Sequence, residues 1–324
     1  HSAMDGFAVR VADLERAPLP VHGECRIGRP PPALPDAPAA IRIVTGAPIP
    51  PNADLVLRRE DVEERVEPNA IIPSPAALAS ARLGDHIRRR AENARAGAPL
   101  LPRGCILDAA ALSALAAVGA VNPKVHARVR VSLLTTGDEV VDPSAAPSPY
   151  EIRNSNALAI RAILSAHPWL DVLAHAHVPD EPDALWRTLA SALDASDAVV
   201  LTGGVSMGHR DHVRETIERA SGSVLFHGLP QRPGKPILGA ITSRGQPLLA
   251  LPGNPLSAMI TATRIGIPAL AACAGILSLP PRPRVRLLTP ITRPLALWWH
   301  RLVRLDDNAD AHLDDSQGSS DLVS

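Results

Sequence analysis

The chain has 324 residues, enough for two or three domains with hydrophobic cores of their own. Hydrophobic residues make up 46% and the formal net charge is zero, which argues against a nucleic-acid-binding surface and an acidic tail. Cys25, Cys105 and Cys273 are widely separated, which disfavours a disulfide framework and a zinc knuckle. The apolar run Ala109–Val121 is too short to cross a bilayer, and we see no signal peptide. We therefore expect a cytoplasmic protein that binds no membrane.

Residues 1–126 mix short strand-like runs with many prolines and turns. Ile41–Val44 and Asp54–Leu57 are such runs, and Leu107–Val118 has the composition of a helix that Pro123 stops. This pattern predicts a mixed α+β N-terminal region.

The pattern changes after Arg128 to strands that alternate with helices. We predict strands over 129–135, 171–178 and 197–202, helices over 156–166, 182–194 and 211–220, strand-like segments near 223–227, 236–241 and 247–251, and a helix over 255–273. Such alternation predicts an α/β fold with a mostly parallel sheet, which binds ligands at the carboxyl ends of its strands.

Proline residues near position 280 mark a linker, and the residues after it begin as strands. We therefore divide the chain into three parts: 1–126, an α/β domain over 127–278, and the start of a β domain over 279–324. Both ends of the sequence look cut.

The stretch TGGVSMGHRD, residues 202–211, joins a buried strand to a helix. Its glycines allow a sharp turn, and the following helix start offers unpaired N–H groups to an anion. The spacing matches neither the dinucleotide fingerprint nor the P-loop. Taken alone, the stretch is equally an anion site or a plain tight connection.

Each of the first three strands of the alternating region is followed by an acidic residue, namely Glu139, Asp180 and Asp211. In a parallel sheet these carboxylates would meet at one edge, where Mg²⁺ could join them to phosphate oxygens. The alternative is that Asp180 and Asp211 are only helix N-caps.

Two proline-framed loops follow, RPGKP at 232–236 and LPGNPLS at 251–257. The first carries Arg232 and Lys235. Only one other lysine, Lys124, occurs in this arginine-rich chain, so a lysine kept here suggests a site that needs a compact ammonium group. The second loop can direct a helix start at an anion.

Eight segments in order resemble the molybdopterin molybdotransferases of molybdenum cofactor biosynthesis, the family that includes the C-terminal domain of gephyrin. The segments are SAMDGFA at 2–8, IVTGAPIPPNADLV at 43–56, IRRRAENARAG at 87–97, TTGDEV at 135–140, IRNSNA at 152–157, TGGVSMGHRDHV at 202–213, RPGKP at 232–236 and LPGNPLSA at 251–258. The resemblance implies a multi-domain protein: a central molybdopterin-binding α/β domain, a mixed α+β N-terminal region without its first helices, a small β-rich subdomain and a truncated C-terminal β-barrel-like domain.

The resemblance also implies a reaction. Such enzymes take adenylated molybdopterin and molybdate, break the phosphoanhydride with a divalent cation, release AMP and leave molybdenum on the dithiolene sulfurs. Relatives act as homodimers, and a molybdopterin adenylyltransferase and apo-molybdoenzymes are further candidate partners.

Residue roles carry over from the family by position. The resemblance makes Glu139, Asp180 and Asp211 catalytic residues that bind or orient the metal, and it places Asp5 and Thr45 in a cleft completed by the second subunit. The residues expected to bind substrate are Gly203, Gly204 and Ser206 at the pyrophosphate, Arg232, Lys235, Ser257, Arg301 and Ser319 at molybdate, and Pro252 and Pro255 in the turn beside them.

Two positions depart from the family pattern. Asn93 stands where an aspartate is usual, and Gly228 stands where a lysine is common. These departures motivate a second hypothesis, a catalytically degenerate molybdopterin-binding or scaffold protein. A third is a molybdopterin adenylyltransferase, which would not need residues 1–125.

Overall fold

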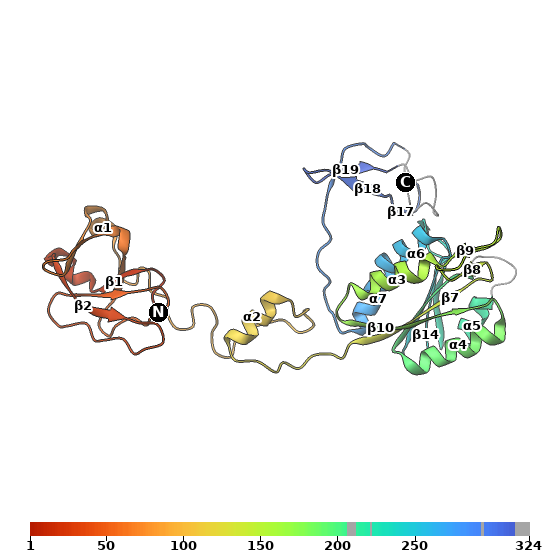
Figure 1. The fold of residues 1–324 in the computed structure, drawn as a ribbon, viewed down its shortest axis with the longest axis horizontal. Coiled ribbons are helices and arrows are strands. Elements are labelled where there is room, and N and C mark those ends of the chain that lie inside the picture. Colours follow the sequence, from red (N-terminus) through yellow and green to blue (C-terminus); the bar gives the residue numbers. More distant parts are fainter. Residues whose placement is uncertain (206–211, 221, 293–294, 315–324) are drawn as a thin grey trace. The chain divides into compact units, whose positions relative to one another are not determined.

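The computed structural model describes residues 1–205, 212–220, 222–292 and 295–314 (Figure 1). The chain forms two compact units, residues 1–100 (unit 1) and 101–324 (unit 2). Each unit has its own sheet and its own hydrophobic clusters. The chain is therefore a multi-domain protein of mixed α/β structure, as predicted.

Unit 1 is built on a six-stranded sheet of order β4-β1-β3-β2-β6-β5. Its elements are β1 (Gly6–Val9), η1 (Val11–Arg16), β2 (Leu19–Cys25), β3 (Ala40–Ile43), β4 (Leu55–Arg58), η2 (Arg59–Asp61), β5 (Val62–Arg65), β6 (Ala70–Pro73) and α1 (Pro75–Ser80). Side chains alternate along β1: Phe7 and Val9 pack into one hydrophobic cluster and Ala8 into another. Both faces of the sheet are therefore covered, with all four residues of β1 buried.

Unit 2 begins with α2 (Ala109–Ala117) and centres on a six-stranded sheet of order β10-β7-β11-β15-β14-β12. The sheet elements and helices are β7 (Val129–Thr136), α3 (Ser155–Ser165), β10 (Leu170–Val178), α4 (Pro182–Ala195), β11 (Ala198–Thr202), α5 (His212–Ala220), β12 (Ser223–His227), β14 (Leu238–Ile241), β15 (Pro247–Leu251), α6 (Pro255–Thr261), η3 (Ala262–Gly266) and α7 (Ile267–Cys273). The predicted helix and strand segments are all present.

The sheet of unit 2 has four parallel strands and two antiparallel strands at one edge. β10, β7, β11 and β15 run parallel, whereas β14 and β12 join them antiparallel. The expectation of a mostly parallel sheet is thus confirmed, since four of the six strands run parallel, and the two strands at one edge differ in direction. The difference arises because short connections link β12, β14 and β15, and a parallel pair needs a long crossover such as a helix.

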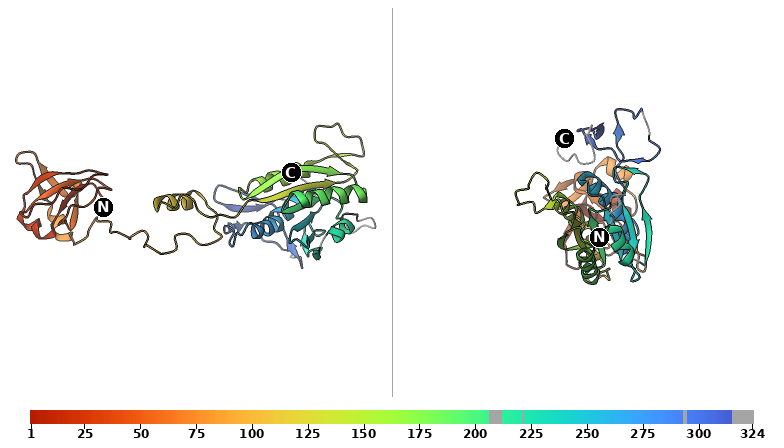
Figure 2. Two further views of the ribbon diagram at one scale, coloured as in Figure 1. Left: turned by 90° about the horizontal axis from the view of Figure 1, so that it is seen from below. Right: turned by 90° about the vertical axis from the view of Figure 1, so that its right-hand side faces the viewer.

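Helices cover both faces of this sheet (Figures 1 and 2). Ile160 of α3 and Leu270 of α7 pack on one face with Leu133, while Leu189 of α4 and Ile217 of α5 pack on the other. The continuous helix over Pro255–Cys273 is long and apolar enough to span a membrane by composition alone, but half of it is buried in this core. Its packing is that of a core helix.

Four shorter pairings complete unit 2. The strands are β8 (Val140–Val141), β9 (Ile152–Arg153), β13 (Gln231–Arg232), β16 (Arg286–Leu287), β17 (Trp298–Trp299), β18 (Val303–Leu305) and β19 (Asp310–Leu313). β8 pairs with β9, β13 pairs with β17, and β16 and β18 flank β19. The β13–β17 pair matters for function because it fixes residues near the carboxyl end of the chain beside the RPGKP loop.

Candidate functional site

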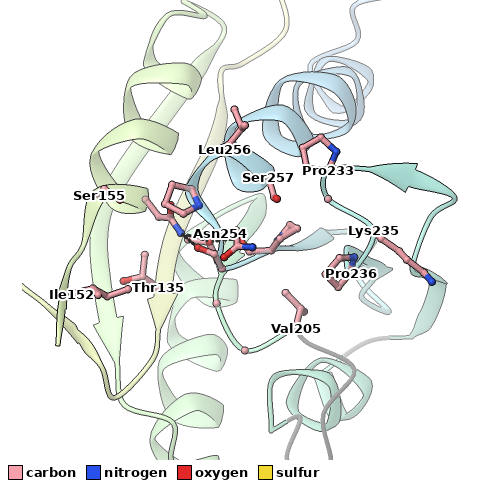
Figure 3. Close-up of a pocket in the computed structure, with 18 of the residues that line it drawn as sticks. Thr135, Ile152, Ser155, Val205, Pro233, Lys235, Pro236, Asn254, Leu256 and Ser257 are labelled. Carbon is pink, nitrogen blue, oxygen red and sulfur yellow. Dashed lines mark hydrogen bonds between the residues drawn. The ribbon is translucent and has the colours of Figure 1, made fainter. Parts of the chain in front are cut away.

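A pocket of about 1000 Å³ lies at the carboxyl ends of β7, β11 and β15. Figure 3 shows Thr135, Ile152 and Ser155 on one side of it, Lys235 on the other, and Asn254 between them. The ends of parallel strands leave a crevice because the chain departs from neighbouring strands to opposite faces. The pocket therefore occupies the place predicted for a ligand.

The glycine turn after β11 is packed so closely that only glycine fits. Gly203 has a φ of +102°, and a Cβ added there would lie 2.3 Å from the carbonyl oxygen of Thr136. Gly204 has a φ of +64°, and its added Cβ would lie 2.4 Å from Val213. Both glycines line the pocket, so the turn exposes backbone rather than side chain to a ligand. Ser206 and Asp211, predicted beside them, lie outside the described residues.

A second turn, after β15, lies beside the first and faces the same pocket. Pro252 and Pro255 line it, and Pro255 is the first residue of α6. Ser257, in the first turn of this helix, is only 3% exposed and points toward the pocket (Figure 3). Its hydroxyl has no hydrogen-bond partner among the described residues. A buried hydroxyl without a protein partner beside a helix start is a group that a ligand can use.

Cationic side chains dominate the charged lining. Among the described lining residues, Arg153, Arg232, Lys235 and Arg301 contribute four positive charges against the single carboxylate of Glu139. Neither Arg232 nor Lys235 forms an ion pair or side-chain hydrogen bond with a described residue, and both are exposed. The pocket therefore favours an anion over a neutral or cationic ligand.

Arg301 reaches the pocket through the β13–β17 pair. Trp299 pairs in register with Arg232, and the His300 N–H donates to the Arg232 carbonyl oxygen at 2.8 Å. The Arg301 guanidinium lies over the Trp299 ring, 4.6 Å from its centroid. Two segments about seventy residues apart in sequence thus present Arg232 and Arg301 to one pocket. Ser319, predicted with them, lies outside the described residues.

Glu139 and Asp180 occupy different positions. Glu139 lines the pocket, and its carboxylate has no partner among the described residues. Asp180 does not line the pocket; its carboxylate accepts a hydrogen bond from the Thr136 hydroxyl, and its N–H donates to Asp138. The N-cap of α4 is Glu181, so the alternative that Asp180 caps this helix is wrong. Asp180 instead holds the loop after β10 against the end of β7.

Asp5 and Thr45 lie in unit 1 and form a hydrogen-bonded pair. One carboxylate oxygen of Asp5 accepts from the Thr45 N–H at 2.7 Å and from its hydroxyl at 2.8 Å. These two bonds, the backbone bond first, hold the pKa of Asp5 below its usual value, and the charge of Arg59 adds to the effect. Two residues that the sequence placed in one site, although forty positions apart, are thus in direct contact.

The structure adds lining residues that the sequence analysis did not select. The Asn156 side chain donates to Thr202 and to the carbonyl oxygen of Gly253, joining the two turns of the pocket. Asn154 caps α3 and also donates to the Thr135 hydroxyl. The only signal for them was the IRNSNA segment, which was recognised as a motif but given no role.

Comparison with protein families gives two matches. Residues 132–272 match the family described as "Probable molybdopterin binding domain", and residues 1–119 match the "MoeA N-terminal region (domain I and II)". The first match covers β7 to α7, with most of the pocket, and the second covers all of unit 1.

Curated relatives agree along most of the chain. It is 38% identical over 307 residues to the molybdopterin molybdenumtransferase of Synechococcus elongatus, covering 91% of this chain and 72% of that protein. It is 32% identical over 284 residues to the enzyme of the same name from Nostoc, covering 85% of this chain and 64% of that protein. The chain thus spans between three-fifths and three-quarters of the length of these relatives.

A solved structure shows the same fold. The molybdopterin biosynthesis moeA protein of Pyrococcus horikoshii superposes with a TM-score of 0.78 at 22% identity, over 99% of this chain and 79% of that one. At this identity the likeness concerns the fold, and it extends over both units.

Proposed function

The chain belongs to the molybdopterin molybdenumtransferase family of molybdenum cofactor biosynthesis, and from this premise we propose the reaction that its pocket supports. The pocket takes adenylated molybdopterin and molybdate, the phosphoanhydride bond of the substrate breaks, and AMP leaves. Molybdenum remains on the dithiolene sulfurs. The protein therefore acts as a transferase that makes molybdenum cofactor.

One observation carries this proposal. Nine of the residues that the sequence assigned to the site, drawn from five separate segments, line a single pocket: Glu139, Gly203, Gly204, Arg232, Lys235, Pro252, Pro255, Ser257 and Arg301. The described lining residues have a net positive charge, and both the phosphoanhydride and molybdate are anions. Family membership and charge thus favour the same ligands.

One group of residues suits the phosphates and another suits molybdate. The turn at Gly203 and Gly204 and the helix start at Pro255 suit the phosphates, because glycine lets a ligand approach the backbone closely and a helix start carries partial positive charge. Lys235, Arg232 and Ser257 suit molybdate, a tetrahedral dianion that accepts charge-assisted hydrogen bonds. With both ligands anionic, the cations also offset the repulsion between them.

A divalent cation, proposed to be Mg²⁺, fits the residues present. Mg²⁺ usually keeps several waters and binds one or two carboxylates together with substrate phosphates. Glu139 offers an unpartnered carboxylate in the pocket wall, and Asp211 would be a second ligand. The described residues hold no group of three metal-ligating side chains, which this mode of binding does not need. When bound, the cation would stabilise negative charge on the phosphoanhydride as it breaks.

Further parts of the proposal concern assembly and setting. We infer a cytoplasmic homodimer in which Asp5 and Thr45 complete the site of the second subunit, with residues 127–278 as the molybdopterin-binding domain and 279–324 as the start of a barrel-like β domain. Molybdopterin adenylyltransferase would supply the substrate, and apo-molybdoenzymes would receive the product.

The test is AMP release. Full-length protein incubated with adenylated molybdopterin, Mg²⁺ and molybdate should release AMP, and omission of molybdate or Mg²⁺ should prevent it. Absence of AMP in the complete mixture, with the Synechococcus relative active in parallel, would refute the proposal. ATP-dependent adenylation of molybdopterin would instead identify an adenylyltransferase.

The same assay separates an enzyme from a degenerate binding protein. Asn93 lies in unit 1, and Gly228 adopts a φ of +81° in the turn after β12 and does not line the pocket. A degenerate protein would bind molybdopterin tightly without releasing AMP. If Asn93 is the cause, Asn93→Asp should restore turnover.

A further inference from the structure

Asn156 joins the two neighbouring turns that follow β11 and β15 at the pocket. It is the second residue of α3, and its amide nitrogen donates to the Thr202 hydroxyl at 3.1 Å and to the carbonyl oxygen of Gly253 at 2.7 Å. Thr202 ends β11 immediately before the glycine turn, and Gly253 lies in the turn before α6. One side chain therefore links three segments at positions 156, 202 and 253.

The orientation of this amide follows from its partners. A carbonyl oxygen can only accept, so Gly253 requires the NH₂ group. The Thr202 hydroxyl donates its single hydrogen to the Pro252 carbonyl oxygen at 3.0 Å, so it too must accept from Asn156. Both bonds need the same nitrogen, and turning the amide over would place its oxygen against two acceptors.

This arrangement leaves the Asn156 carbonyl oxygen buried without a hydrogen-bond partner. Burying an unpaired acceptor is unfavourable, and native proteins keep few such atoms. The amide therefore adds less to stability than its two bonds would suggest. Its geometry serves to fix the spacing of the two turns.

We propose that Asn156 is a positioning residue for the substrate, a role that rests on the proposed function of the pocket. It holds the Gly203–Gly204 turn and the Pro252–Asn254 turn at a set separation, so that both meet the phosphates of the nucleotide part without rearrangement. The Thr202 hydroxyl, which accepts from Asn156, in turn donates to the Pro252 carbonyl oxygen. Preorganised walls bind the ligand more tightly because no ordering cost falls on binding.

The test measures AMP binding to the full-length protein by calorimetry, together with KM and kcat for adenylated molybdopterin. Asn156→Ala should raise the Kd of AMP and the KM about tenfold, with kcat lowered less than about threefold, because the turns contact ground state and transition state alike. Asn156→Asp should raise the Kd further, to about thirtyfold, because a carboxylate oxygen then opposes the Gly253 carbonyl oxygen.

Stability separates positioning from a structural role. Both variants should keep a melting temperature within about 3 °C of wild type, since Gly253 is exposed and water can replace the lost donor. Leu158→Gln is the matched control: Leu158 lies on the same helix, is 62% exposed and does not line the pocket. It should bind AMP as the wild type does.

A double-mutant cycle tests the link itself. Thr202→Val keeps the shape of the side chain and removes the hydroxyl, so it should raise the Kd of AMP by itself. If Asn156 and Thr202 act together, the double variant should raise the Kd of AMP by less than the product of the two single-variant factors. Independent, multiplicative effects would overturn the proposal.

Other outcomes also decide the matter. Unchanged AMP affinity in Asn156→Ala, or a melting temperature lowered by more than about 5 °C with affinity intact in the folded protein, would overturn the positioning role alone. A wild-type protein that neither binds nor releases AMP would overturn the proposed function as well.

Discussion

The predicted site residues of unit 1 and of unit 2 differ in how far their polar groups are satisfied. In unit 1 the Asp5 carboxylate already accepts two hydrogen bonds from Thr45. In unit 2 Arg232 and Lys235 have no partners among the described residues, and the Ser257 hydroxyl is similarly free. The contrast indicates that the Asp5 carboxylate is already paired, whereas Arg232 and Lys235 are available to an anion.

The pocket of unit 2 depends on close backbone packing, which the first variant would break. Gly203→Ala should lower the free energy of unfolding by about 3 kcal/mol, because it combines a strained φ with a clash against the Thr136 carbonyl oxygen. Denaturation by urea, followed by tryptophan fluorescence, reports on this unit because all four tryptophans belong to it.

Gly245→Ala is the control for this glycine. Gly245 lies in the same unit with a φ of +82°, but nothing lies within 4 Å of an added Cβ. Gly245→Ala should lower the free energy of unfolding by about 1 kcal/mol, from the backbone conformation alone. Equal losses in the two variants would show that the close approach of the glycine turn to β7 contributes nothing.

The unpaired cations give the second prediction. Lys235→Ala should raise the molybdate concentration for half-maximal AMP release about thirtyfold, equivalent to about 2 kcal/mol, through loss of a charge-assisted hydrogen bond. Because Lys235 is exposed and pairs with no described residue, the melting temperature should not change. Lys124→Ala, at the other lysine of the chain and away from this pocket, should leave the molybdate requirement as it is. An unaltered requirement in the Lys235 variant would remove Lys235 from the molybdate site.

The sequence predicted the central strands of unit 2 well because β7 and β11 are buried almost throughout and read as apolar runs. Val129–Thr136 and Ala198–Thr202 match the expected ranges within one residue. Strand direction was harder to predict from the sequence. β12 and β14 have the same apolar pattern as parallel strands, and their connections make them antiparallel. The pattern of a strand records burial, and it does not record pairing.

Site residues were predictable where a loop follows a strand. They were not predictable where their contacts are distant in sequence. Gly203 and Lys235 stood out by their residue types. Asn156 did not, because its partners lie 46 and 97 positions away. The alternative that Asp180 is an N-cap is wrong because Pro182 takes the first helical position, which makes Glu181 the N-cap.

The third prediction concerns Asp5 of unit 1, whose carboxylate already accepts two hydrogen bonds. Thr45→Val removes the hydroxyl bond to Asp5, so the pKa of Asp5 should rise toward its ordinary value. The rise should be incomplete, since the Thr45 N–H still donates. A carboxyl-detected NMR titration measures it directly. Thr45→Ser keeps a hydroxyl and should retain the low pKa; a pKa raised equally in both variants would mean that the side-chain bond is not its cause.

The smallest expected effect is a pH dependence of the stability of unit 2, which arises beside the Thr135 hydroxyl. His175 and His177 of β10 both contact the Thr135 hydroxyl, at 2.7 and 3.0 Å, and Asn154 donates to the same oxygen. Burial lowers the pKa of His175 below its usual value, and the nearby His177 and Arg161 add to this. The native state therefore binds a proton less readily than the unfolded chain, whose histidines titrate near pH 6.5.

The sign of the effect follows from this difference. The contribution of neutral His175 to stability is present above about pH 6.5 and is lost as the pH falls, because the unfolded state then gains protons first. His175→Gln should reduce the slope of the urea midpoint between pH 7.5 and 5.5 without abolishing it, since burial also lowers the pKa of His167. A hydroxyl has one hydrogen and two lone pairs, so Thr135 cannot satisfy Asn154 and two protonated imidazoles together. Acid should therefore loosen the pocket wall at Thr135; an unchanged slope in His175→Gln would exclude His175 as the source.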